Sequence, residues 1–94
     1  MIHHIVLWTL KNPADAPRFK ALLDTCAQVV PGIHAFEVGI RSDALEANVD
    51  VALVSVFADA AALEAYQKHP HHQAVAAELG TLRSERRVLD FARP

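Results

Sequence analysis

The segment EAYQKHPHHQAV, residues 64–75, gathers most of the side chains in this chain that could do chemistry. His69, His71 and His72 lie within four positions, and the only tyrosine, Tyr66, precedes them. An imidazole exchanges a proton near neutral pH, and a phenol donates a hydrogen bond to a carbonyl oxygen. The segment therefore indicates proton-transfer chemistry, a metal site or the hydrogen bonding of a helix start.

Pro70 makes the three histidines inequivalent. Proline favours the first helical position and biases the residue before it towards an extended conformation. We therefore expect a helix to begin at Pro70 with His69 as its N-cap. The residues three, four and seven positions after His72 are all apolar, so His72 shares the inward stripe, whereas His71 is rotated roughly 100° towards solvent.

His72 is expected to be neutral near pH 7. The first turn of a helix carries the positive end of the helix dipole, and partial burial also disfavours a charged imidazolium. A neutral imidazole suits a general base or a fixed hydrogen-bonding group.

His4 is the third candidate, on a predicted strand at residues 2–10. It shares an apolar face with Val6 and Trp8, where a polar group needs a partner or a pocket. The spacing allows Tyr66, His72 and His4 to converge on one cavity. The structural alternative is that a partly buried histidine near a helix start more often caps or hydrogen-bonds the backbone than catalyses a reaction.

Metal, phosphate and disulfide chemistry are disfavoured. Zinc sites usually combine separated ligand pairs with cysteine or carboxylate support, and the only cysteine, Cys26, falls on the apolar stripe of a predicted helix. The chain has no glycine-rich phosphate loop, nucleophile elbow or Cys-x-x-Cys pair. We therefore predict no metal and no cofactor.

Composition indicates one domain, residues 1–94, that has a partner. The chain is 52% hydrophobic, and a domain this small with surplus apolar surface usually covers it with another subunit. The net charge is −2 with no basic stripe, which argues against nucleic acid. Because no run of about 18 apolar residues and no signal peptide occur, we expect a cytoplasmic protein without a membrane span.

The elements that must position the candidates alternate along the chain. Strands are predicted at residues 2–10, 33–41, 49–57 and 86–91. Helices are predicted at residues 16–30, in a short stretch capped by Asp59, and from Pro70 until Gly80 stops it, while Pro31 and Gly32 end the first helix.

The order βαββαβ predicts an α+β ferredoxin-like fold with a four-stranded antiparallel sheet and the helices on one face. Residues 2–10 are apolar on both faces, however, so the second face also needs cover. We expect two copies to pack sheet to sheet as a dimeric α+β barrel with the helices outside.

Five segments along the chain carry a resemblance: HIVLWTLK at 4–11, VPGIHAFEVG at 30–39, DVALVSVFAD at 50–59, YQKHPHHQAV at 66–75 and VLDF at 88–91. Together they resemble the stress-responsive A/B barrel (Dabb) domain family. The Tyr-x-x-His-Pro-x-His element is the most specific of these. The family implies a homodimeric barrel with a cleft between helices and sheet.

The resemblance also implies roles for the candidates. In plant members that act as polyketide cyclases, the tyrosine and second histidine of that element serve in an intramolecular aldol-type cyclisation, supported by a histidine of the first strand. These positions match Tyr66, His72 and His4. A further histidine at the start of the third strand is not matched, because this chain has Val51 near there.

Three functions stay open on this basis. The first is a cofactor-independent cyclase, lyase or isomerase acting on an unknown small molecule, in which Tyr66 holds a carbonyl oxygen, His72 removes the α-proton and His4 orients the substrate or His72. The second is a non-catalytic stress-response or ligand-binding dimer, which predicts an absent or sealed cavity beside Tyr66. The third, a relative of haem- or quinol-handling barrel enzymes, rests on fold analogy alone.

Overall fold

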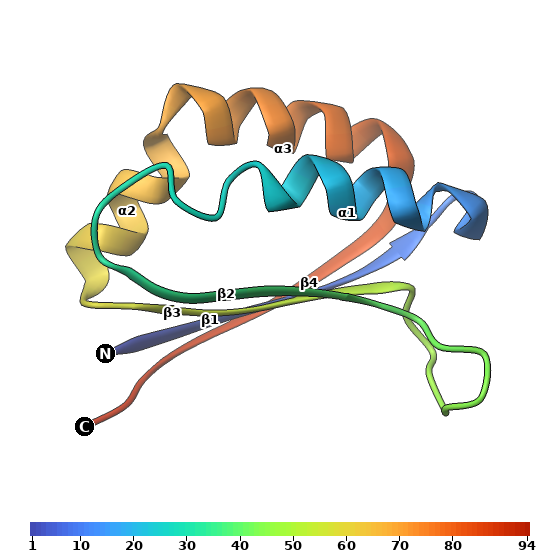
Figure 1. Ribbon diagram of the computed structural model, residues 1–94, viewed down its shortest axis with the longest axis horizontal. Coiled ribbons are helices and arrows are strands. Elements are labelled where there is room, and N and C mark those ends of the chain that lie inside the picture. Colours follow the sequence, from blue (N-terminus) through green and yellow to red (C-terminus); the bar gives the residue numbers. More distant parts are fainter.

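The computed structural model describes all 94 residues, with one sheet and the helices on a single side of it (Figure 1). The elements are β1 (Ile2–Leu10), a short 3₁₀ helix (Pro13–Asp15), α1 (Ala16–Asp24), β2 (Ile33–Ile40), β3 (Val51–Phe57), α2 (Ala60–Lys68), α3 (Pro70–Leu82) and β4 (Arg83–Ala92). The strand order is β2-β3-β1-β4, and all neighbours are antiparallel. The predicted ferredoxin-like α+β fold is confirmed.

β1 lies inside the sheet and determines which side chains reach the helices. Its even-numbered residues, from His4 to Leu10, are buried under the helices, and its odd-numbered residues are half-buried on the opposite face. This alternation follows from the two-residue period of a strand. Val6 pairs with Leu53 of β3 on one side and with Val88 of β4 on the other.

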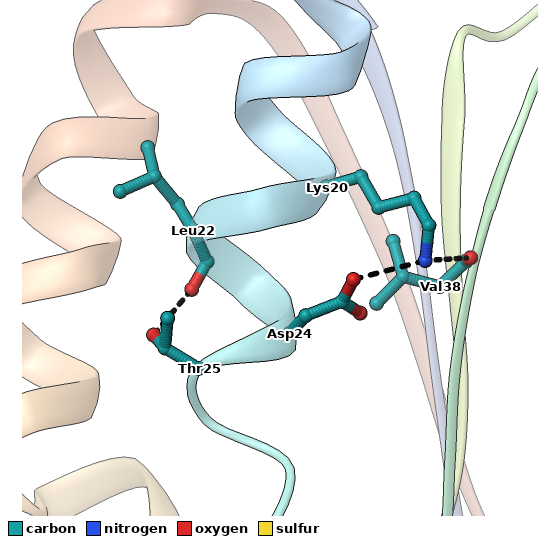
Figure 2. Close-up of polar contacts among 5 residues, drawn as sticks. All are labelled: Lys20, Leu22, Asp24, Thr25 and Val38. Carbon is teal, nitrogen blue, oxygen red and sulfur yellow. Dashed lines mark hydrogen bonds and ion pairs between the residues drawn. The ribbon is translucent and has the colours of Figure 1, made fainter.

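The first helix is shorter than the predicted residues 16–30. α1 ends at Asp24, after which backbone N–H groups bond to carbonyls only three residues back. Figure 2 shows the Thr25 hydroxyl donating to the Leu22 carbonyl oxygen at 2.6 Å, a local bond that competes with helix continuation. The apolar spacing that predicted a longer helix still corresponds to burial, because Cys26 in the turns that follow α1 is fully buried.

The Lys20 ammonium group links α1 to the edge of the sheet by a hydrogen bond. Lys20 Nζ donates to Asp24 Oδ2 at 3.0 Å and to the Val38 carbonyl oxygen of β2 at 3.1 Å (Figure 2). Beneath it, the Phe19 ring meets Trp8 edge-on with centroids 5.0 Å apart. The contacts fix α1 over the β2 side of the sheet and leave the β4 side to α3.

Gly80 does not stop the last helix, contrary to the prediction. Only Gly32 has a positive φ, of 90°, so the left-handed stop that Gly80 would provide is absent. α3 continues to Leu82 and ends where Arg83 becomes extended, with its N–H bonded to the Leu79 carbonyl oxygen. β4 consequently begins at Arg83 rather than at residue 86.

A further boundary differs from the prediction. β3 begins at Val51 rather than at residue 49, and the buried Asp50 carboxylate just before it accepts a hydrogen bond from the Leu10 N–H at 2.8 Å. The Pro31–Gly32 turn does lead into β2, although α1 has already ended. A Cβ added to Gly32 would lie 2.9 Å from the Ala62 Cβ, so this turn requires glycine.

The sheet face opposite the helices is apolar and uncovered. Ile5 of β1 lies between Val54 of β3 and Leu89 of β4, whose side chains are 46% and 62% exposed. His3 stacks on the exposed Phe91 ring beside them. The two apolar faces predicted for residues 2–10 are therefore present. No helix of the chain combines the length and the apolar composition that crossing a membrane requires.

Candidate active site

A cavity of about 230 Å³ lies between the helices and the sheet and is partly open to solvent. His4 from β1, Tyr66 from α2 and His72 from α3 all line it, together with Arg83 and Arg86 from β4. The rest of the wall is apolar. The volume falls below the roughly 300–1,000 Å³ of pockets for drug-sized molecules, so the ligand that fits is small.

The junction between α2 and α3 brings two of these side chains together. His69 is extended, with φ −61° and ψ 133°, and its Nδ1 accepts a hydrogen bond from the His71 N–H at 3.1 Å. The N-cap predicted for His69 is confirmed, and Pro70 takes the first helical position. Because the chain changes direction here, the rings of Tyr66 and His72 approach to 4.4 Å between centroids.

Tyr66 has a buried hydroxyl group without a partner. The residue is 1% exposed, its ring packs against Phe57, Phe36 and His4, and its oxygen makes no hydrogen bond. A buried polar atom in this state costs about 1–3 kcal/mol. Burial also raises the pKa of Tyr66 well above its usual value, so the phenol stays protonated and remains an unused hydrogen-bond donor.

The tautomer of His72 leaves its Nε2 nitrogen free to accept a proton. Its Nδ1 lies 3.2 Å from the Gln67 carbonyl oxygen, and a carbonyl can only accept, so Nδ1 carries the proton and Nε2 keeps its lone pair. Burial lowers the pKa of His72, the Gln67 hydrogen bond opposes that effect, and the charges of His4, Arg86 and His69 lower the pKa further. The ring is therefore neutral near pH 7.

His4 is held by a carboxylate from the other end of the chain. The residue is 3% exposed, and its Nδ1 lies 2.5 Å from Asp90 Oδ1 on β4, where the two residues are register partners. A carboxylate oxygen accepts the hydrogen bond, so Nδ1 is the donor, and the other ring nitrogen is left without a bond to the chain. His4 makes no hydrogen bond to His72.

Asp90 and Arg86 were not among the predicted site residues. Both lie on the helix-facing side of β4, opposite His4 and Trp8 of β1. The signal that could have found them is the pairing of the first strand with the last, but the sequence alone does not give the register of two strands so far apart.

The remaining histidines and the cysteine lie outside the site. His71 is exposed, as predicted, and its Nε2 is 2.7 Å from Thr25 Oγ1. Cys26 is a free, buried thiol in the core. No group of three or more His, Cys, Asp or Glu side chains is arranged to hold a metal ion.

Known proteins match this chain in fold and partly in sequence. A Dabb family protein with a ferredoxin-like fold from Mesorhizobium loti is 25% identical, with a TM-score of 0.80 over 99% of this chain and 96% of that one. A dimeric ferredoxin-like protein of unknown function from Jannaschia sp. is 27% identical, with a TM-score of 0.78 over 98% of each chain.

A second dimeric ferredoxin-like protein of unknown function, from Thermobifida fusca, is 24% identical, with a TM-score of 0.85 over 98% of this chain and 90% of that one. A comparison with curated proteins finds no match. The model of the stress responsive A/B barrel domain, Dabb, matches residues 2–93. With nearly the whole chain matched, this protein belongs to the stress-responsive A/B barrel (Dabb) domain family.

Proposed function

We propose that this Dabb protein is a cofactor-independent enzyme that removes a proton next to a carbonyl group of a small molecule, in an aldol-type cyclisation or an isomerisation. The observation that carries the proposal is the cavity that Tyr66, whose hydroxyl group is buried and unpartnered, shares with the neutral His72. An unsatisfied donor on a residue that lines a cavity favours a ligand oxygen as its missing partner.

The proposed reaction assigns one role to each side chain. Tyr66 donates to the carbonyl oxygen, and this bond strengthens as negative charge gathers there in the enolate. His72 Nε2 accepts the α-proton. In a cyclisation, the enolate carbon then bonds to a second carbonyl carbon of the same molecule, and the His72 imidazolium returns the proton to the alkoxide formed there. His4, fixed by Asp90, orients the substrate.

The proposed assembly is a homodimer joined through the uncovered sheet face. Ile5, Val54 and Leu89 form an apolar stripe across three strands of that face, and apolar surface of this kind is stabilised by burial against a complementary copy. The helices and the cavity lie on the other side of the sheet, so each subunit keeps its own site.

The test is the exchange of α-protons for deuterium in small ketones such as 2-indanone, followed by proton NMR in D₂O. Wild-type protein should accelerate exchange above the uncatalysed rate. His72→Ala should lose about 10²-fold or more of that acceleration, while His71→Ala, its exposed neighbour, should retain it. Full activity in His72→Ala would exclude His72 as the base, and ketone binding without any exchange would support a non-catalytic ligand-binding dimer instead.

A further inference from the structure

The cavity carries two arginines that nothing in the chain neutralises. Arg83 and Arg86 line it, and no aspartate or glutamate does. Neither arginine takes part in any of the chain's six ion pairs or in a side-chain hydrogen bond. The cavity is therefore locally cationic in a protein whose net charge is −2.

Arg86 is placed to act on the site rather than on solvent alone. It lies on the helix-facing side of β4, paired in register with the buried Trp8. Its charge lowers the pKa of His72 and opposes, in part, the rise in the pKa of Tyr66 that burial causes. The next residue, Arg87, points to the opposite face and forms an ion pair with Glu85 at 3.4 Å.

We propose that the ligand of this cavity carries a carboxylate and that Arg86, assisted by Arg83, binds it. This inference rests on the proposed function and names its substrate class, a small keto acid. A guanidinium presents a planar fork of N–H donors that matches the two oxygens of a carboxylate. Anchoring the acid group on β4 places the rest of the molecule, with its carbonyl, between β4 and the Tyr66 hydroxyl.

The cationic wall also suits the chemistry. An enolate adds a second negative charge to a bound keto acid, and a positive charge at the wall of a largely apolar cavity stabilises that charge. Asp90 does not cancel this effect at the cavity wall, because its carboxylate is already bonded to His4 and does not line the cavity.

The experiment compares two ligands that differ only in charge. 3-Benzoylpropionate and its primary amide are titrated separately into the full-length protein and followed by isothermal titration calorimetry. Wild type should bind the carboxylate about tenfold or more tightly than the amide. Arg86→Gln should remove this preference by weakening carboxylate binding far more than amide binding, whereas Arg86→Lys should keep part of it. Arg93→Gln, which removes a charge outside the cavity, should behave as wild type.

The outcomes separate this inference from the proposed function. Equal binding of both ligands by wild type, equal weakening of both by Arg86→Gln, or no carboxylate binding at millimolar concentration would overturn the inference, even if ketone exchange is observed. A carboxylate preference lost in Arg86→Gln would support it, even if no α-proton exchange occurs. Melting curves of each variant confirm that the fold is retained.

Discussion

At the scale of single residues, stability and chemistry oppose each other at Tyr66. The three site side chains are all largely or partly buried, but His4 and His72 each have a partner for one ring nitrogen, whereas the Tyr66 oxygen has none. The free protein bears the cost of that unmet hydrogen bond. A ligand oxygen that accepts it would recover the cost, so Tyr66 would supply binding energy in addition to its proposed role in catalysis.

Tyr66→Phe should therefore stabilise the ligand-free protein. Removing a buried, unpaired hydroxyl should raise the free energy of unfolding by about 1 kcal/mol, measured by urea denaturation. The same variant should lose about 10²-fold of its α-proton exchange rate, since the enolate loses its donor. A clear fall in stability would mean that the hydroxyl has a partner in the folded protein.

His72 should make stability depend on pH in a defined window. Its pKa is lowered in the folded protein by burial, whereas an unfolded imidazole titrates near pH 6.5. As the pH falls below about 6.5, His72 takes up a proton in the unfolded chain before it does so in the folded chain. The contribution of neutral His72 to the free energy of unfolding is therefore complete above about pH 6.5 and is lost on acidification.

The variant His72→Gln removes this titration. Urea denaturation at several pH values should show that His72→Gln loses less free energy of unfolding between pH 7 and pH 5 than wild type does. Because the other histidines are common to both proteins, the difference isolates His72. Identical pH dependence in the two proteins would contradict a lowered pKa.

At the scale of elements, the junction of α2 and α3 aligns the site. The helix break at Pro70 and the N-cap at His69 could be predicted from the sequence, because both depend on local backbone chemistry. The same holds for the Asp59 cap, whose carboxylate accepts from the Ala62 N–H at 2.8 Å. The inward position of His72 followed from helical periodicity.

What could not be predicted depends on contacts between distant segments. α1 ends at Asp24, where the Thr25 hydroxyl bonds the Leu22 carbonyl oxygen and meets His71 of α3, and no local pattern reveals the second contact. Asp90 joins the site only through the register of β4 on β1. Sequence periodicity predicts which residues share one face of a strand or helix, whereas the register between two strands is determined by packing of the complete sheet.

His69→Ala should weaken the junction. Loss of the side-chain cap on the His71 N–H should lower the free energy of unfolding by about 1 kcal/mol, and exchange activity should fall because Tyr66 and His72 lose their fixed approach. His69→Asp, which supplies a carboxylate cap, should restore both quantities. Denaturation and exchange assays measure them, and an unaffected His69→Ala would show that Pro70 alone fixes the junction.

At the scale of the whole molecule, the uncovered sheet face calls for a partner. Leu89 of the edge strand β4 is 62% exposed and lies beside Ile5 of the inner strand β1. This exposure has little structural justification in a single subunit, whereas a second copy packed sheet to sheet would bury the stripe on both subunits at once.

Leu89→Glu should therefore dissociate the dimer without unfolding the subunit. The variant would place one charge of each subunit in the proposed sheet interface, and burying these charges is costly. Multi-angle light scattering should give the mass of a dimer for wild type and of a monomer for the variant. Ala65→Glu, at an exposed position of α2, is the matched control and should stay dimeric, and a monomeric wild type at micromolar concentration would refute the assembly.

The pairing of β1 with β4 has a consequence for how the protein comes into being. His4 and Asp90 are 86 positions apart, and the amino terminus itself bonds the Arg93 carbonyl oxygen. During translation His4 is made 86 positions before its carboxylate partner. The helices can form while β4 is still being made, but the His4–Asp90 pair forms only when β4 joins β1.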